Sequence, residues 1–441
     1  MSDPGLVPVE TAQASVQAGV EPVRDTEAAA PEAALGRVLA ASVHALTSLP
    51  PWDNSAMDGY AIRASDVGSA TEASPVRLAV IGEVRAGLAP DVVVVAGSAV
   101  RIATGAPMPP GADAVVAVEQ TTPVDATGAR GQRGRDATGP LPAACFVHLP
   151  VGAGSSIRRM GGDVTAGDRL ADPGDTVTPA VVALAAGAGV AAVEIRRRPV
   201  VAVLATGDEV RPAGEALGPA GIPDANGPGL RALVRDVGAD AIDLGIASDQ
   251  LEDVVARLRR GIASADIVIV AGGVSVGPYD VVRQAFETVG RIDLWRVAVQ
   301  PGKPFAFGRA DVAGRAAPVL LFGLPGNPVS AFVTFELFVR PVIRRLAGHV
   351  ALHRPAETGV LDDAVSKSLG RRGYQRVATI RDDHGRPVRD AQGRIRVRLA
   401  GGQGSSVLSA FAAADALAIV PEAVERLEPG AEVELLWLDR G

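Results

Sequence analysis

The fold class of this chain is indicated by the run Val200-Val201-Ala202-Val203-Leu204, which continues into Ala205-Thr206-Gly207-Asp208-Glu209. Consecutive apolar, mostly β-branched residues are typical of a strand that is buried on both faces of a parallel sheet. Downstream, helical and strand patterns alternate, and this alternation predicts a parallel sheet with right-handed crossovers. The expected helices cover 229–237, 251–262, 281–289 and 330–346, and the expected strands cover 241–244, 267–271 and 319–322. The sequence therefore predicts a multidomain α/β protein whose central domain, residues 198–347, is a doubly wound, mostly parallel sheet.

The segments that flank this domain have other patterns. Residues 1–28 mix Pro, Gly, Ala and acidic residues, and we expect a flexible tail there because such a segment buries too little apolar surface. Apolar residues at helical spacing predict an amphipathic helix over 31–41 and another helix over 178–189. Short β-branched runs between Gly and Pro clusters predict β domains. The expected units are an N-terminal helical and linker domain (29–58 and 151–197), an inserted β domain (59–150) and a C-terminal, barrel-like β domain (348–441).

Composition excludes several classes of protein. The chain has 441 residues, which is enough for three or four domains. Its formal charge of −7 argues against nucleic-acid binding, which needs an excess of Lys and Arg. The single cysteine, Cys145, excludes an internal disulfide and has no companions at zinc-ligand spacing. Without a signal peptide or a membrane-length apolar run, we expect a cytoplasmic protein that contacts no membrane.

Chemistry is expected at the carboxyl ends of the predicted strands, where doubly wound sheets bind their ligands. Glycine-rich turns there let backbone N–H groups approach a phosphate, next to the positive end of the following helix. None of these turns carries a Walker lysine, so a standard P-loop NTPase is excluded. The residues that we expect to bind substrate are Thr206, Gly207, Asn226, Gly272, Gly273, Ser275, Gly277, Pro325, Gly326 and Asn327.

Two carboxylates stand beside these phosphate-binding turns. Asp208 and Asp280 would repel an anionic ligand unless a divalent metal ion lay between them. Mg²⁺ suits this arrangement, because it typically takes one or two carboxylates together with phosphate oxygens. We therefore predict Asp208 and Asp280 as ligands of a magnesium cofactor, with Lys303 as a separate cation.

An ordered set of motifs over residues 30–441 resembles one family, the molybdopterin molybdenumtransferases, which include bacterial MoeA and the C-terminal domain of gephyrin. The motifs are DNSAMDGYA (53–61), ATGAP (103–107), PGADAVV (110–116), ATGDE (205–209), GGVSVG (272–277), PGKP (301–304) and GLPGNPVS (323–330).

The resemblance implies an activity and an assembly. It implies an elongated homodimer whose active cleft lies between the α/β domain of one subunit and the N-terminal domains of the other. The implied substrates are adenylylated molybdopterin and molybdate. Molybdenum is transferred to the dithiolene and AMP is released, with help from Mg²⁺, which polarises the phosphoanhydride. Contacts with a molybdopterin adenylyltransferase and with molybdoenzyme chaperones are also implied.

Individual roles follow from the resemblance, position by position. It implies catalytic roles for Asp58, Asp208, Asp280 and Lys303. It adds Arg296, Pro301, Ser405 and one of Arg371, Arg372 and Arg376 to the substrate-binding set, of which we name Arg376. The chain departs from the family at two positions, where Gly162 replaces a glutamate and Gln300 replaces a lysine. Arg158, Arg159 or Arg296 are expected to supply the cation that an oxyanion needs.

Alternative functions stay open from sequence. A molybdopterin adenylyltransferase uses a related α/β domain, although the extra N-terminal and C-terminal domains argue against it. The loss of the glutamate at Gly162 and of the lysine at Gln300 is also typical of a non-catalytic paralogue that binds cofactor intermediates. Tungstate and molybdate are tetrahedral oxyanions of similar size, and the sequence does not separate them.

Overall fold

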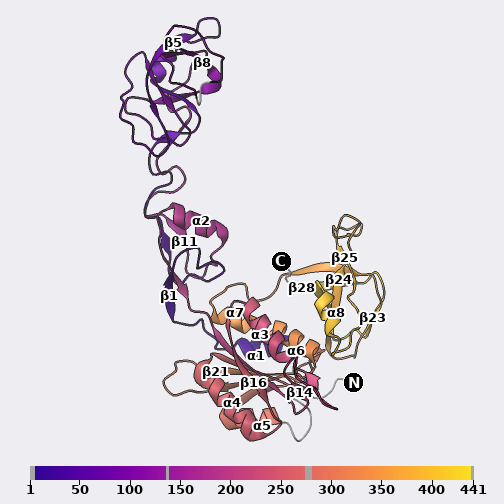
Figure 1. The fold of residues 1–441 in the computed structure, drawn as a ribbon. Helices are drawn as coiled ribbons and strands as arrows, with labels where there is room; N and C mark the ends of the chain where they lie inside the picture. Colours follow the sequence, from indigo (N-terminus) through magenta and orange to yellow (C-terminus); the bar gives the residue numbers. More distant parts are fainter. Residues whose placement is uncertain (1–4, 136–138, 274–280, 439–441) are drawn as a thin grey trace.

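The computed structural model describes residues 5–135, 139–273 and 281–438, and a six-stranded sheet organises its largest unit. Figure 1 shows an elongated molecule. One β unit lies at the far end, a small linker unit follows it, and the α/β and C-terminal units lie together at the other end (Figure 1).

The central sheet has the strand order β16-β13-β17-β21-β20-β18. The first four strands are parallel and β20 runs antiparallel to both of its neighbours, β21 and β18, which confirms a mostly parallel α/β domain. Its strands are β13 (Val200–Thr206), β16 (Asp240–Ala247), β17 (Ile267–Ala271), β18 (Arg291–Trp295), β20 (Ala306–Ala310) and β21 (Val319–Leu324), and a short pair, β14 (Val210–Arg211) and β15 (Ile222–Pro223), follows β13.

Helices cover both faces of this sheet, as the doubly wound prediction requires (Figure 1). On one face lie α3 (Asn226–Asp236), α6 (Pro328–Thr334) and α7 (Arg340–Leu346), and on the other lie α4 (Leu251–Ser264) and α5 (Val281–Val289). In α4 the buried residues Val254, Val255 and Leu258 form one stripe, because positions i, i+1 and i+4 share a helix face. The central strands are buried on both sides, which explains their continuous apolar runs.

Two predictions near the N-terminus were wrong, the flexible tail over 1–28 and the helix over 31–41. Within the expected tail, α1 (Val9–Gln17) is a helix whose Val9, Ala12 and Val16 are buried in the α/β core. Their i, i+3, i+7 spacing forms an apolar stripe, and this tertiary packing outweighs the polar composition of the segment. Residues 31–41, predicted as a helix, form turns and isolated bridges instead, through Val38 and Leu39.

The predicted helix over 330–346 is interrupted. A π turn at Phe335–Val339 separates α6 from α7. Pro341 lacks the N–H that a continuous α-helix would use at this point, and π turns occur where the regular ladder is broken. The turn carries Glu336 into the protein interior, where it is buried.

The linker unit and the far β unit follow one another along the chain. The linker unit pairs β1 with β12 and β2 with β11, and it carries α2, which lies within the predicted helix 178–189. The far unit is a six-stranded sheet of order β7-β4-β6-β5-β9-β8. The linker elements are β1 (Thr26–Ala29), β2 (Val43–His44), β3 (Asn54–Ser55), β10 (Ile157–Arg158), β11 (Arg169–Ala171), α2 (Pro179–Gly187) and β12 (Val193–Arg196). The far strands are β4 (Gly59–Ile62), β5 (Val76–Val84), β6 (Ser98–Ile102), β7 (Ala114–Ala117), β8 (Thr121–Val124) and β9 (Ala144–Val147), with 3₁₀ turns at Ala64–Val67 and Val118–Gln120.

The C-terminal unit is a closed β-barrel, as expected. Its strands pair in the order β24-β25-β22-β28-β26, and β26 pairs back with β24 to close the ring. The strand β19 (Val299–Gln300), which comes from the α/β unit, adds to its edge. The other elements are β22 (Ala356–Leu361), β23 (Val365–Ser366), β24 (Arg372–Thr379), β25 (Ile395–Leu399), α8 (Leu408–Ala413), β26 (Ala416–Val420), β27 (Arg426–Leu427) and β28 (Glu432–Trp437). No helix within the described ranges has the length and apolar character that crossing a bilayer requires.

Candidate functional site

The reversal of strand order in the central sheet lies between β13 and β17. The chain runs from β13 outward to β16 and then returns to β17 on the other side of β13. Such a switch point leaves a crevice at the carboxyl ends of the two strands, where ligands bind. The side chain of Thr206, the last residue of β13, is buried there, and its hydroxyl has no hydrogen-bond partner among the described residues.

Glycines let the turns after β13 and β17 approach each other closely. A Cβ on Gly272 would lie 2.5 Å from the carbonyl oxygen of Thr206, and one on Gly273 would lie 3.0 Å from the hydroxyl oxygen of Thr206. Both glycines have positive φ, so any other residue is excluded twice, by space and by backbone conformation.

The turn after β21 joins the same edge. The side-chain amide of Asn226, at the start of α3, donates a hydrogen bond to the carbonyl oxygen of Gly326 at 2.7 Å. Pro325 precedes Gly326 at the end of β21, and a Cβ on Gly326 would be in ordinary contact with Gly272. Asn327 donates from its amide to the Ser405 hydroxyl at 3.0 Å and thereby connects this edge to the C-terminal barrel. The structure thus brings together the described turn residues that the sequence singled out.

Asp208 has an acidic neighbour that sequence reasoning missed. The backbone N–H of Asp249 donates to the Asp208 carboxylate at 3.1 Å, and the N–H of Asp208 donates to the Asp249 carboxylate at 3.3 Å. Asp249 follows the end of β16, which pairs with β13. Its position next to Asp208 could be predicted only if the order of strands in the sheet were known. Three predicted residues, Ser275, Gly277 and Asp280, lie outside the described residues. Across the described ranges, no group of three or more His, Cys, Asp or Glu side chains is arranged to hold a metal ion.

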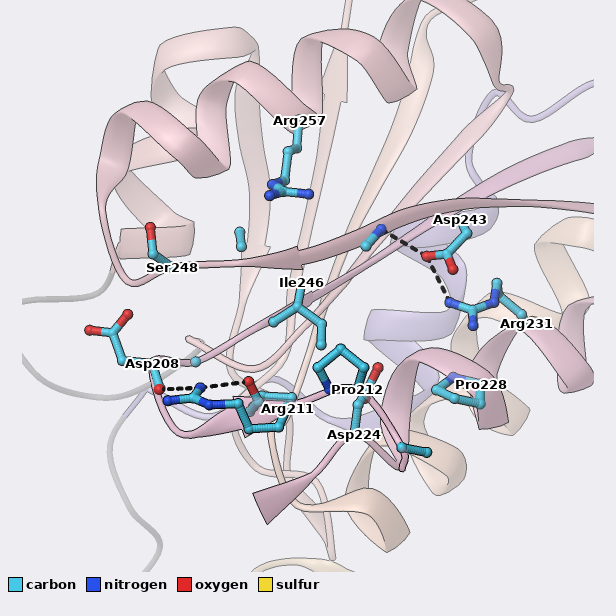
Figure 2. Close-up of a pocket in the computed structure, with 15 residues that line it drawn as sticks. Asp208, Arg211, Pro212, Asp224, Pro228, Arg231, Asp243, Ile246, Ser248 and Arg257 are labelled. Carbon is cyan, nitrogen blue, oxygen red and sulfur yellow. Dashed lines mark hydrogen bonds and ion pairs between the residues drawn. The ribbon is translucent and has the colours of Figure 1, made fainter. Parts of the chain in front are cut away.

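A large cavity of about 750 Å³ lies beside Asp208, and we call it the edge cavity (Figure 2). Figure 2 shows Asp208 on one side of it, the Arg231–Asp243 ion pair on the other, and Arg257 entering from α4. Arg211 is turned toward backbone carbonyl oxygens of Asp208 and Val210. Alternating acidic and basic side chains make this cavity polar and suited to a ligand that carries both donors and acceptors.

A second cavity of about 340 Å³ lies where the α/β unit meets the barrel, and we call it the junction cavity. Its lining includes Gln300, Pro301, Lys303, Arg371, Arg376 and Ser405. Three of these side chains are cationic, and the described lining contains no carboxylate. Such a set of guanidinium, ammonium, hydroxyl and amide donors favours a small oxyanion.

The three candidate arginines have different surroundings. Arg372 forms ion pairs with Glu10 of α1 and with Glu422, so its charge is already matched. Arg376 is fully buried and donates to the carbonyl oxygens of Gly402 and Gly404 at 3.3 and 3.2 Å, which holds the Ser405 turn. Burial lowers the pKa of Arg376 to about 10, which still leaves the side chain charged at neutral pH. Arg371 and Arg376 therefore face the junction cavity, while Arg372 serves the packing of α1.

Arg296 lies near this junction, in the turn between β18 and β19. Its φ of 71° places it in the left-handed region, which is uncommon for a residue other than glycine. Its carbonyl oxygen accepts a hydrogen bond from Val7, and its Nε is buried without a partner among the described residues.

Asp58 lies far from these turns within one chain. It directly precedes β4 of the far β unit, at the opposite end of the molecule from β13 and β16 (Figure 1). Its carboxylate accepts a hydrogen bond from the N–H of Thr104 at 2.7 Å. Nearby, Arg159 pairs with Asp53 at 2.6 Å, and Gly162 lies in the turn that follows. A hydrogen bond from the N–H of Met160, together with Arg159, lowers the pKa of Asp53.

Comparison with known proteins identifies the family. Residues 7–189 match the family described as the MoeA N-terminal region (domain I and II), residues 202–345 match the probable molybdopterin binding domain, and residues 358–438 match the MoeA C-terminal region (domain IV). "Molybdopterin molybdenumtransferase 2" of Mycobacterium tuberculosis is 38% identical over 409 residues, which are 91% of this chain and 92% of that protein. The chain belongs to the molybdopterin molybdenumtransferase family.

Another molybdopterin molybdenumtransferase and a solved structure support the same family assignment. The Haemophilus influenzae enzyme is 34% identical over 403 residues, which are 91% of each chain. The crystal structure of the molybdopterin biosynthesis MoeA protein from Pyrococcus horikoshii superposes with a TM-score of 0.77 at 30% identity, and the match covers 99% of this chain and 100% of that one. The chain is thus an enzyme of molybdenum cofactor biosynthesis.

Gly162 and Gln300 are the two positions at which the chain departs from the molybdopterin molybdenumtransferase pattern, and the structure shows what each of them contacts. The side-chain oxygen of Gln300 accepts a hydrogen bond from the N–H of Ser368 at 3.0 Å, so this residue helps to attach the barrel. A Cβ on Gly162 would lie 3.1 Å from the carbonyl oxygen of Arg159, a tight contact. A glutamate at Gly162 would therefore require a small shift of the turn.

Proposed function

We propose that this enzyme inserts molybdenum from molybdate into adenylylated molybdopterin and releases AMP, in the cytoplasm and as a homodimer. The junction cavity is the observation that carries the proposal. Its size of about 340 Å³ and its lining by Lys303, Arg371 and Arg376 suit a compact dianion such as molybdate. Because Arg376 is buried and held by backbone carbonyl oxygens, its donors are positioned before the anion arrives.

The adenylylated substrate is assigned to the switch point and the edge cavity. The Thr206 hydroxyl has no hydrogen-bond partner among the described residues, and the turns at Gly272 and Gly326 lie close together at the carboxyl ends of the neighbouring parallel strands. The edge cavity of about 750 Å³, which begins at Gly207 and Asp208, is large enough for a nucleotide. Asn327 and Ser405, joined at 3.0 Å, lie between this edge and the junction cavity. A substrate at the sheet edge would therefore extend its dithiolene toward the bound oxyanion.

Magnesium is the cofactor that the family implies, and the carboxylates present fit it. Asp208 and Asp249 lie side by side and keep oxygen lone pairs beyond the one hydrogen bond that each accepts from the described residues. Mg²⁺ commonly takes one or two carboxylates and completes its shell with phosphate oxygens and water. We assign Asp208 and Asp249 as its protein ligands, and when bound the ion would polarise the phosphoanhydride.

The position of Asp58 supports the proposed homodimer. Within one chain, Asp58 and Asp208 belong to units at opposite ends of the molecule (Figure 1). A second copy that placed its far β unit over the sheet edge would bring Asp58, Arg158 and Arg159 to the cleft. Arginines on that unit would then supply the positive charge that is lost where Gln300 replaces a lysine.

A reconstitution assay tests the proposal. Purified enzyme is incubated with adenylylated molybdopterin, molybdate and Mg²⁺, AMP is measured by chromatography, and cofactor is measured by activation of an apo-molybdoenzyme. We expect AMP and active cofactor to form together, and we expect Arg371→Gln to raise the molybdate concentration needed for half-maximal rate about tenfold. Arg259→Gln, an exposed arginine on α4, is the matched control. Absence of AMP at saturating substrate contradicts the proposal.

The surroundings of Gly162 also favour a second candidate, a paralogue that binds cofactor intermediates without turnover. Here a catalytic carboxylate of the family is absent, and Gln300 is committed to Ser368. Tight binding of adenylylated molybdopterin without AMP release would select this candidate. Adenylylation of molybdopterin from ATP by the chain alone would instead select the adenylyltransferase reading.

A further inference from the structure

A cavity of about 340 Å³ lies between the linker unit and the α/β unit, and arginines surround it. We call it the arginine cavity. It is bounded by residues next to β12, by the ends of α3 and α7, and by the turn before Val38. Its arginines are Arg37, Arg196, Arg197, Arg198, Arg235 and Arg344. It is separate from the edge and junction cavities, with which it shares no lining residue.

The charge of this cavity is strongly unbalanced. Only one carboxylate, Asp236, belongs to its described lining, and that side chain pairs with Arg354 at 3.6 Å. Two of the arginines have acidic partners outside the lining, Arg37 with Glu27 and Arg197 with Asp25 and Asp266. For the other four, the described residues supply no carboxylate partner. Four guanidinium groups thus converge on one cavity without matched negative charge.

Donors around the cavity also remain unused. The Nε of Arg196 is buried and has no hydrogen-bond partner among the described residues. The side chains of Arg198 and Arg235 are exposed, and neither forms a hydrogen bond or an ion pair with the described residues. His349, which also lines the cavity, has its pKa lowered to about 4 by burial and then by Arg344 and Arg340. The imidazole is therefore neutral at neutral pH, and the contribution of the two arginines is in keeping with a positive potential in the cavity.

We propose that the arginine cavity binds a small tetrahedral oxyanion with two negative charges, of the phosphate or molybdate type, at a site distinct from the catalytic one. Guanidinium groups match the geometry of such anions and bind them through paired N–H donors. A cavity of about 340 Å³ admits a compact anion and lies at the lower end of the range for small-ligand sites. The anion would connect Arg198, next to β12, with Arg235 on α3 and Arg344 on α7, and so fix the linker unit against the α/β unit.

A purely structural role explains only some of these arginines. Arg37 donates to the carbonyl oxygen of Arg196, Arg196 to that of Val23, and Arg344 to that of Ala351. These bonds hold the segments around the cavity. They do not explain Arg198 and Arg235, whose side chains are exposed at its rim. Substituting Arg198 and Arg235 therefore tests anion binding without removing the structural hydrogen bonds around the cavity.

The experiment uses the full chain and calorimetric titration with inorganic phosphate and, separately, with sodium molybdate. We expect Arg198→Gln/Arg235→Gln to weaken binding of one anion per chain about tenfold or more, because each lost arginine removes charge-assisted hydrogen bonds. Arg198→Lys/Arg235→Lys, which keeps the charge, should retain part of the affinity. Arg259→Gln, on the opposite face of the sheet, and Arg371→Gln, in the junction cavity, should leave this site unchanged.

The outcomes decide both the site and its ligand. Loss confined to the phosphate titration identifies phosphate as the ligand, loss confined to the molybdate titration identifies molybdate, and loss in both supports the shared chemistry. Unchanged titrations of both anions in the glutamine double variant would overturn the proposal. A wild-type chain that binds neither anion would overturn it as well. Melting curves check folding, and anion should raise the melting temperature of the wild type more than that of the double variant. AMP release in the reconstitution assay is a separate readout, so failure of this site and failure of the proposed function are distinguishable.

Discussion

The buried ion pair between Glu336 and Arg354 gives a sharp test of how the α/β unit is held together next to the barrel. Arg354 donates to the two carboxylate oxygens of Glu336 at 2.9 and 3.2 Å. The side chain of Glu336 is only 1% exposed and that of Arg354 only 6%. Glu336 lies in the π turn between α6 and α7, and Arg354 lies in the segment that leads to β22. The substitution Arg354→Met leaves a buried carboxylate without its main partner.

The structure sets the size of the expected effect. Removing one member of a buried ion pair costs about 3–5 kcal/mol, because the remaining charge stays away from water. Arg340 lies 3.7 Å from the Glu336 carboxylate and compensates in part, so the lower end, about 3 kcal/mol, applies. For a domain of about 150 residues this loss corresponds to a fall in melting temperature of about 6–12 °C.

Calorimetry of the full chain measures this loss. In Glu336→Leu/Arg354→Met both charges are gone, and most of the stability should return. Arg283→Met is the control, because the Arg283–Glu287 pair is exposed on α5 and surface pairs contribute little. An unchanged melting temperature in Arg354→Met, or a double variant that melts lower than the single one, would refute the reasoning.

Three further predictions concern other parts of the molecule. Thr206→Val keeps the shape but removes the buried hydroxyl, so stability should hold while AMP release falls about tenfold, and equal rates would contradict the assignment. Because the folded-state pKa of His349 is depressed to about 4, the stability it contributes is complete above pH ~6.5 and is lost as the pH falls toward ~4. That loss of stability is on the order of 1–2 kcal/mol after allowance for partial exposure. Melting curves in anion-free buffer should show that His349→Gln abolishes this pH-dependent loss. Val16→Ala should destabilise the α/β unit by about 1–2 kcal/mol in urea unfolding, whereas a tail residue would have no effect.

The central sheet could be predicted because its signals are local. The run Val200–Leu204 and the run at Ile267–Ala271 are apolar without interruption, and that pattern has few readings other than a buried parallel strand. The N-terminal helix α1 could not be predicted in the same way. Its apolar stripe has only Val9, Ala12 and Val16, and its partners lie hundreds of residues later in the chain. Tertiary contacts of that kind are invisible to composition.

The turn residues of the candidate site could be predicted from the sequence, whereas the cavities beside them could not. Thr206 ends a strand, and Gly272 and Gly326 follow strands, so sheet order alone brings them together. Asp249 escaped notice because its role depends on the pairing of β16 with β13. The junction cavity needed the docking of the barrel, since Arg376 and Lys303 come from different units. The three candidate arginines differ only in their tertiary partners, which is why the sequence left them equivalent.

The proposed reaction inserts one molybdenum atom into the cofactor for each adenylate that is cleaved. The direct measurement is the ratio of AMP released to molybdenum incorporated, determined by chromatography and elemental analysis on the same single-turnover sample. We expect a ratio close to one and little AMP when molybdate is omitted. AMP release that is equally fast without molybdate, or molybdenum incorporation without AMP release, would contradict it.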